Sequence, residues 1–320
     1  MQPILEVKGL NKIFKVKSNK LLEKAKALQA LSNISLSVFP GETLGVIGES
    51  GCGKSTLGKV IMGIEAPTSG SIEFEGNDIL STTKAEKRQL LKDIQIVFQD
   101  PYSSLNPRKT IEYLIAEPMV IHNIGTPESR REKVTELLEL VGLSRYQAKR
   151  FPHEFSGGQR QRVNIARALA LSPKLIVCDE PVSALDVSIQ SQVLNLFNDL
   201  QKNLNLTYIF ISHDLSVVKY ISDRIAIMYL GNIVEVGTAE EIYKAPKHPY
   251  TNALFNAIPP ESPLENAEVE LLKGEVPSPF NKPVGCPFST RCPKVQPCCS
   301  QGDIPFVDVS PTHQVACVLY

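Results

Sequence analysis

Gly48 to Ser55, GESGCGKS, has the residue types and the spacing of a phosphate-binding loop. It stands between the apolar run TLGVI and a segment of helical period, so it would join a strand to the start of a helix. Glycines allow several backbone N–H groups to converge on phosphate oxygens, and the helix start adds the positive end of its dipole. Lys54 is then expected to reach the β- and γ-phosphates, and the Ser55 hydroxyl to bind Mg²⁺. The expected nucleotide-binding residues here are Gly48, Glu49, Ser50, Gly51, Cys52, Gly53, Lys54, Ser55 and Thr56.

A second apolar run, Leu175 to Cys178, ends in two adjacent carboxylates. Asp179 is placed to hold Mg²⁺ directly or through water, and Glu180 to polarise an attacking water as a general base. Carboxylates are common at strand ends, so the pair alone is a weak signal. Downstream of a phosphate loop it predicts nucleotide hydrolysis.

A third segment, Ser156-Gly157-Gly158-Gln159, leads into the helical stretch RQRVNIARALAL. A serine followed by two glycines at a helix start offers a hydroxyl and uncovered backbone N–H groups, which is again an anion site. In isolation such a segment is usually an ordinary loop. Together with the phosphate loop, it gives the chain two helix starts that could bind phosphate.

The elements that would position these groups follow an alternating order. Short apolar runs that look like strands are Ile4 to Val7, Ile34 to Val38, Thr43 to Ile47, Ile94 to Phe98, Leu175 to Cys178 and Tyr208 to Ile211. Longer helical segments separate them, so we predict an α/β fold with a largely parallel sheet. Between Pro101 and Phe155 the strand signal disappears, and Pro127 to Val141 has helical spacing, which predicts a helical subdomain at about 100–170. Lys15 to Leu28 is expected to be an exposed basic loop or short helix.

The overall composition excludes several classes of protein. In the 320 residues, 34 Lys and Arg balance 34 Asp and Glu, so no global field favours nucleic acid or an anionic membrane. The apolar runs are too short to span a bilayer, and the first residues, MQPILEVKGL, lack the pattern of a secretory signal. We therefore expect a soluble, cytosolic protein without nucleic-acid partners.

The order of the motifs resembles the nucleotide-binding domain of ABC transporters, an ABC-type P-loop domain with a RecA-like sheet core and an inserted helical subdomain. In that family two domains pair head to tail, and ATP lies between the phosphate loop of one and the SGGQ of the other. The resemblance implies a contact to Mg²⁺ and water for Gln99, in VFQDPYSSLNPR, and a γ-phosphate contact for His213. It implies a place in the loop that crosses the dimer interface for Asp186, in SALD. Phe14 would stack on adenine, although a core role fits it nearly as well.

Several segments resemble more narrowly the ATPase subunits of bacterial oligopeptide and dipeptide permeases, and within them the second of two paired subunits. These are VFQDPYSSLNPR, SGGQRQRVNIARAL, HPYTNALFNAIP, GEVPSPFNKPVGCPFSTRCP and HQVAC, which cover the chain almost end to end. The resemblance implies a peripheral subunit on the cytoplasmic face of the bacterial inner membrane that energises peptide import. Its partners would be a paralogous ATPase subunit or a second copy, two integral membrane subunits and, indirectly, an extracytoplasmic binding protein. A nickel importer of the same architecture and a soluble ABC ATPase are the alternatives.

The C-terminal end has its own chemistry. After a nucleotide-binding domain at 1–258, residues 259–285 are rich in proline and charge and read as a linker, and 286–320 form a cysteine-rich module. Four thiolates could hold Zn²⁺ or a [4Fe–4S] cluster. The module lacks the close CxxC pairs of zinc sites, and the family resemblance implies an iron–sulfur cluster, with disulfides as the minor option in the cytosol. The expected ligands are Cys286, Cys292, Cys299 and Cys317, with Cys298 as the alternate to Cys299, while His313 is expected on the surface or beside the ligands.

Overall fold

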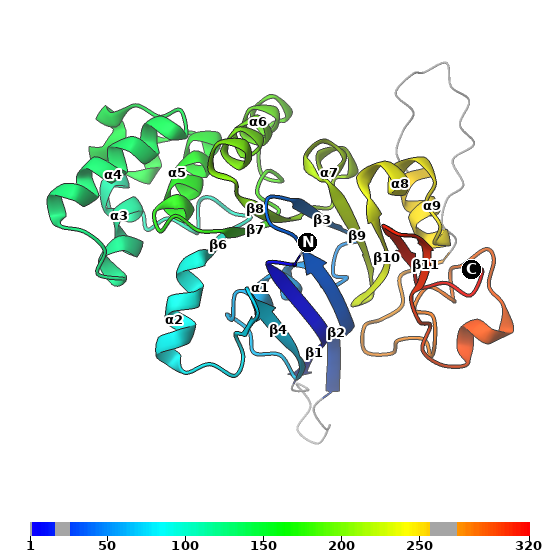
Figure 1. Ribbon diagram of the computed structural model, residues 1–320. Helices are drawn as coiled ribbons and strands as arrows, with labels where there is room; N and C mark the ends of the chain where they lie inside the picture. Colours follow the sequence, from blue (N-terminus) through cyan, green and yellow to red (C-terminus); the bar gives the residue numbers. More distant parts are fainter. Residues whose placement is uncertain (1, 17–25, 257–273) are drawn as a thin grey trace, which may run out of the picture.

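The main sheet of the computed structural model has the strand order β11-β12-β10-β9-β3-β8-β7-β6 (Figure 1). The structure describes residues 2–16, 26–256 and 274–320. Five strands of this sheet run parallel: β3 (Thr43–Ile47), β6 (Ile94–Val97), β7 (Leu175–Asp179), β8 (Thr207–Ile211) and β9 (Arg224–Tyr229). The predicted strands among them are confirmed with bounds shifted by at most one residue. Every residue of β3, β7 and β8 is buried, as expected for parallel strands covered on both faces.

A second, antiparallel sheet has the order β2-β1-β4-β5 and packs against the main one. Its strands are β1 (Leu5–Val16), β2 (Lys26–Val38), β4 (Ser69–Phe74) and β5 (Asn77–Asp78). The expectation of a loop or short helix from Lys15 to Leu28 is wrong at both ends, because Lys15 pairs with Ala27 and Val16 with Lys26. These strand ends are mostly exposed, so their lysines face solvent without forming a loop. The middle of that segment, 17–25, lies outside the described residues.

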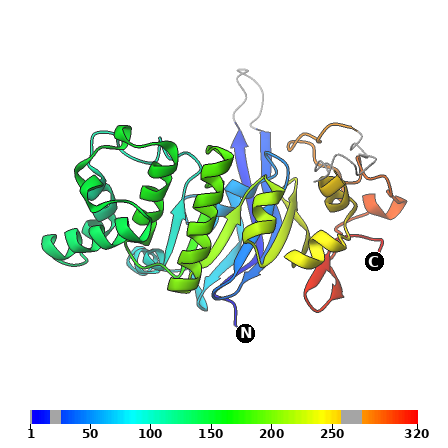
Figure 2. The same ribbon diagram turned by 90° about the horizontal axis from the view of Figure 1, so that it is seen from above.

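The predicted helical insertion is present at one side of the molecule (Figure 1, left). It contains α3 (Ile111–Ile121), α4 (Pro127–Leu140) and the two short helices η1 (Arg145–Lys149) and η2 (Pro152–Glu154), and it is followed by α5 (Gly157–Leu169). Thr110 and Thr126 cap the first two helices through their side chains. Seen from above, the inserted helices, the sheets and the C-terminal segment lie one beside the next (Figure 2).

The remaining helices cover the sheets or follow the last core strands. They are α1 (Lys54–Ile61), α2 (Lys84–Asp93), α6 (Val187–Leu204), α7 (Leu215–Ile221), α8 (Ala239–Lys244) and α9 (Pro249–Asn256). Val193, Phe197 and Leu200 of α6 are buried in the same apolar cluster as the inserted helices. α3 and α4 contact α5, which in turn contacts β6 and α6, so the insertion is packed onto the core sheet through α5.

The C-terminal residues extend the main sheet. β12 (His313–Val315) pairs with β10 (Asn232–Thr238), and β11 (Val307–Ser310) pairs with β12 at the edge. Phe288 is fully buried, with ring centroids 5.4 Å from those of both Tyr229 and Tyr250. The cysteine-rich end thus shares its sheet and part of its apolar core with the elements that precede it in the chain.

A buried carboxylate fixes this attachment. Glu235 of β10 lies 2.7 Å from His313 Nε2, and it accepts backbone hydrogen bonds from Lys247 and His248. The exposed fraction of the Glu235 side chain is 0% and that of His313 is 3%. His313 is therefore not the surface histidine that the sequence suggested, because the pairing of β12 with β10 brings it against a carboxylate remote in sequence.

We predict that Glu235→Gln destabilises the protein by roughly 2–3 kcal/mol, because an amide nitrogen would face buried donors that the carboxylate now satisfies. The free energy of unfolding from denaturant titration measures the effect. Glu240→Gln on the exposed start of α8 is the matched control and should unfold like the wild type. Equal stability of both variants would contradict the structural role of Glu235.

Candidate active site

The phosphate loop joins β3 to α1, as the sequence predicts, and its glycines are needed for two different reasons. A Cβ on Gly48 would lie 2.1 Å from the carbonyl oxygen of Met228, and one on Gly53 would lie 2.6 Å from that of Ala30. Gly51 has open space around it but a φ of +78°, which L side chains rarely adopt. The loop is therefore held against β9 and β2 by close backbone contacts that exclude any side chain.

The Lys54 ammonium points back into the loop. Its Nζ donates to the carbonyl oxygens of Gly48 at 2.7 Å and Glu49 at 3.1 Å, and only 4% of the residue is exposed. Within the described residues no carboxylate forms an ion pair with it. A buried ammonium without a countercharge is costly, so the loop is electrostatically suited to an anion.

The Ser55 hydroxyl and the Asp179 carboxylate, both expected to bind Mg²⁺, are in contact. The Ser55 hydroxyl, in the first turn of α1, donates to Asp179 Oδ1 at 2.8 Å at the end of β7. Burial raises the pKa of Asp179, although the Ser55 hydrogen bond opposes this shift. A carboxylate and a hydroxyl are hard oxygen donors of the kind that Mg²⁺ prefers.

The Glu180 carboxylate lies between the two other predicted catalytic side chains. Gln99 Nε2 donates to Glu180 Oε2 at 2.9 Å, and His213 Nδ1 lies 3.1 Å from the same oxygen. The three residues follow β6, β7 and β8, which are neighbours in the sheet, so their loops meet at one edge. Glu180 has a φ of +48°, an uncommon conformation for a non-glycine residue, which turns the chain sharply where the strand ends.

One cavity of about 580 Å³ unites most of the predicted site. Its lining includes Ser50, Gly51, Gly53, Lys54, Ser55, Thr56, Gln99, Glu180 and His213. Phe14 lines it as well, from β1, with Lys12 Nζ 4.6 Å from its ring centroid. Gly231 and Pro279 also line the cavity, and Pro279 comes from the segment that the sequence suggested to be a linker.

The SGGQ segment and Asp186 do not line this cavity. Ser156 caps α5 by accepting from Gln159 N, and the Gln159 side chain accepts from Ser156 N in return. Asp186 precedes α6 and is exposed. The second anion-binding helix start is thus separate from the phosphate loop of its own chain.

The four expected ligand cysteines, Cys286, Cys292, Cys299 and Cys317, line a second, smaller cavity together with His248. Burial, reinforced by the neighbouring thiols, raises the pKa of Cys286 to about 11. Cys298 is exposed and does not line this cavity, and all seven cysteines are free thiols. In the described part of the chain, no group of three or more His, Cys, Asp or Glu side chains could hold a metal ion as they stand.

Sequence reasoning missed a set of side chains that bind the phosphate loop from the C-terminal end. Arg291 Nη1 donates to both carboxylate oxygens of Glu49, at 3.1 and 3.0 Å, and to the Tyr229 hydroxyl at 3.3 Å. The Tyr250 hydroxyl accepts from Glu49 N at 3.0 Å. No motif marks these residues, and an arginine directly before Cys292 was the one available signal.

A phosphate loop and a carboxylate held beside it at one edge of a parallel sheet, with helices inserted beyond that edge, define the class as an ATP-binding cassette. The family model described as ABC transporter matches residues 31–183, and that described as oligopeptide/dipeptide transporter, C-terminal region, matches 234–299. The chain belongs to the oligopeptide and dipeptide transport family of ABC ATPases and is a transport ATPase. Among the described residues, no helix is long and apolar enough to cross a membrane.

Relatives and solved structures agree with this assignment. The oligopeptide transport ATP-binding protein AppF of Bacillus subtilis (strain 168) is 51% identical over 322 residues, covering 100% of this chain and 98% of its own length. OppF of Salmonella typhimurium, with the same description, is 50% identical over 98% of this chain and 96% of its own. The structure of cbiO1 from Clostridium perfringens, part of the ABC transporter complex cbiONQ, has a TM-score of 0.65 at 30% identity. It covers 77% of this chain and 92% of its own.

We predict that Gly48→Ala abolishes measurable ATP binding, because its Cβ would overlap the Met228 carbonyl at 2.1 Å. Gly76→Ala is the matched control, since its φ is also positive, +78°, but no atom lies within 4 Å. That control should cost about 1 kcal/mol of stability and leave ATP affinity unchanged. Equilibrium titration with a fluorescent ATP analogue distinguishes the two, and equal affinities would contradict the steric argument.

Proposed function

We propose that this chain is the ATP-hydrolysing subunit of a bacterial importer of oligopeptides or dipeptides. The observation that carries the chemistry is the Glu180 carboxylate, which lies between Gln99 and His213 at the edge of the nucleotide cavity. The full-length similarity to oligopeptide transport ATP-binding proteins supports peptide as the cargo. A nickel importer of the same architecture and a soluble ABC ATPase remain the alternatives that a transport assay must separate.

In this proposal each polar side chain of the site has a defined role. Lys54 and the backbone of the loop bind the β- and γ-phosphates, and Ser55, Asp179 and Gln99 hold Mg²⁺. The metal, when bound, neutralises charge on the phosphate oxygens. Glu180 accepts the proton of the attacking water, and the Gln99 amide keeps Oε2 oriented by donating to it.

His213 would contact the γ-phosphate, since it lines the cavity and its Nδ1 already faces Glu180. Phe14 would stack on the adenine, since its ring lines the same cavity. Both positions are supported by the lining of the cavity, which is large enough for a nucleotide.

The site would be completed by a second cassette. Ser156 to Gln159 and Asp186 lie outside their own chain's cavity, so we assign them to the nucleotide of a head-to-tail partner. The partner would be a paralogous ATPase subunit or a second copy of this chain. A dimeric ABC cassette, MJ0796 in a post-hydrolysis state with ADP and Pi, has a TM-score of 0.65 to this chain at 28% identity, covering 73% of this chain and 98% of its own.

The remaining partners follow from the transporter class. Two integral membrane subunits would bind the cassettes through the segment after Gln99, and an extracytoplasmic binding protein would deliver peptide to them. The chain would be peripheral on the cytoplasmic face of the inner membrane. Its balanced charge supports the absence of nucleic-acid partners.

For the C-terminal end we propose a [4Fe–4S] cluster bound by Cys286, Cys292, Cys299 and Cys317. These four thiols line one cavity, and thiolates are the donor set that such clusters use. Zn²⁺ bound by the same four thiols is the alternative. We retain 286–320 as the module's range and 1–258 as the cassette's, with 259–285 between them.

We predict that Glu180→Gln slows ATP hydrolysis by the assembled transporter at least about 100-fold while ATP still binds, because only the general base is lost. Lys54→Ala should lose both binding and hydrolysis. ATP hydrolysis is measured as phosphate release. Import is measured with labelled dipeptides, labelled longer peptides and Ni²⁺. An unchanged rate in both variants would reject the ATPase site, and import of Ni²⁺ alone would reject peptide as cargo.

We predict that anaerobically purified protein contains iron and acid-labile sulfide and absorbs broadly in visible light. Cys299→Ser should lose this iron, whereas the exposed Cys298→Ser should retain it and serves as the matched control. Elemental analysis gives the result directly. Stoichiometric zinc without iron would show that the cluster assignment is wrong.

A further inference from the structure

The phosphate loop is joined to the cysteine-rich end by one ion pair. Arg291 and Glu49 are 242 residues apart in sequence, and a single guanidinium nitrogen bonds both oxygens of the carboxylate. The exposed fraction of the Arg291 side chain is 7% and that of Glu49 is 24%. Removing one partner of a charge pair so shielded from water costs much more stability than removing one partner of a pair on the open surface.

All three polar groups of Glu49 form hydrogen bonds. Its carboxylate accepts from Arg291, its N–H donates to the Tyr250 hydroxyl, and its carbonyl oxygen accepts from Lys54 Nζ. Glu49 therefore stands between the C-terminal end and the lysine that would bind the phosphates. Any displacement of Glu49 changes the backbone carbonyl that orients the Lys54 ammonium.

Arg291 is held by the turn that carries two of the cysteines. Ser289 N donates to the Cys286 carbonyl oxygen and Arg291 N to that of Phe288, both at 3.0 Å, and Cys292 follows directly. Phe288 anchors this turn in the core against Tyr229 and Tyr250. The position of the guanidinium is thus set by the same short turn that sets the positions of two thiols.

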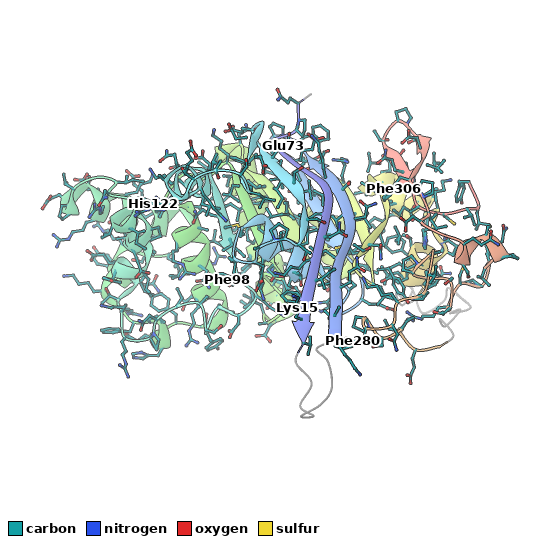
Figure 3. All side chains as sticks on the ribbon, turned by 90° about the horizontal axis from the view of Figure 1, so that it is seen from below. Lys15, Glu73, Phe98, His122, Phe280 and Phe306 are labelled. Carbon is teal, nitrogen blue, oxygen red and sulfur yellow. The ribbon has the colours of Figure 1, made fainter. Side chains whose placement is uncertain are left out.

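A second contact brings the same end of the chain to the nucleotide. Pro279 lines the same cavity as Lys54 and Phe14, and Figure 3 shows Phe280 on the same side of the molecule as Lys15. Lys282 Nζ is buried near Gly231, with no hydrogen-bond partner among the described residues. The C-terminal segment therefore contributes both a wall of the cavity and a support for the loop.

We propose that Arg291 is a positioning residue of the phosphate loop, and that through it the state of the four-cysteine cavity is coupled to nucleotide binding. This inference rests on the proposed nucleotide site and adds its regulation. When the proposed cluster holds the four cysteines together, the turn from Cys286 to Cys292 keeps its position. Arg291, which belongs to this turn, then stays bonded to Glu49. Release of the cysteines frees the turn and weakens the hold on the loop.

The first test separates positioning from folding. Arg291→Ala should raise the KM for ATP roughly tenfold, a typical size for such coupling, and leave kcat within about twofold. Arg291→Lys should recover part of the loss, as should the charge exchange Arg291→Glu with Glu49→Arg. Lys174→Ala is the control, because it also breaks an ion pair, with Glu75, but on the surface away from the cavity.

The second test uses the reciprocity of coupling and needs no activity. Mg²⁺·ADP should slow maleimide labelling of Cys286, Cys292 and Cys317, read by mass spectrometry, in the wild type but not in Arg291→Ala. The inference is overturned if Arg291→Ala leaves the KM unchanged, or if ADP protects the thiols equally in both proteins. If either of these results is found while Lys54→Ala is inactive, the coupling is rejected and the proposed nucleotide site is retained. An active Lys54→Ala would reject the nucleotide site itself.

Discussion

The parallel pairing of β3, β7 and β8, with β6 beside them, is the constraint on which the rest of the structure depends. Parallel strands direct all their carboxyl ends to one edge of the sheet, so the loops that follow these four strands meet at that edge. The pairing of Asp179 with Ile211 sets where β7 stops relative to β8, and hence where Glu180 faces His213. Because these strands are buried on both faces, apolar contacts on each side hold this register.

The folded cassette carries an electrostatic imbalance at this edge, and the imbalance explains what the site binds. Lys54 Nζ is buried against the carbonyl oxygens of Gly48 and Glu49 and the sulfur of Cys52, while burial raises the pKa of Asp179 despite the Ser55 hydrogen bond. Among the described residues, neither side chain forms a salt bridge that would offset its desolvation. A phosphate group beside Lys54 and a divalent cation beside Asp179 would correct both at once, so binding of one favours binding of the other.

The elements that could be predicted from the sequence are those marked by a local pattern of residues. Buried strands such as Thr43 to Ile47 appear as uninterrupted apolar runs, and the phosphate loop has its own spacing, so both could be placed within a residue. The pairing of β12 with β10 joins residues about 80 positions apart through strands too short to show a period, and it was not foreseeable. The same holds for His313 and Arg291, whose partners Glu235 and Glu49 are known only from the tertiary structure. The basic ends of β1 and β2 misled because exposed strand ends and loops share one composition.

The contacts of the C-terminal end show why it is more than cover for a sheet edge. Without the C-terminal strands, β10 would be the edge of the main sheet, and the backbone partners that β12 supplies are enough to protect it from unwanted pairing. Edge protection does not require Arg291 to reach Glu49, nor Pro279 to line the nucleotide cavity. These contacts place a shielded ion pair on the phosphate loop, at the residue whose carbonyl oxygen accepts from Lys54. A segment that only attached the C-terminal end to the sheet would not need an ion pair with the phosphate loop.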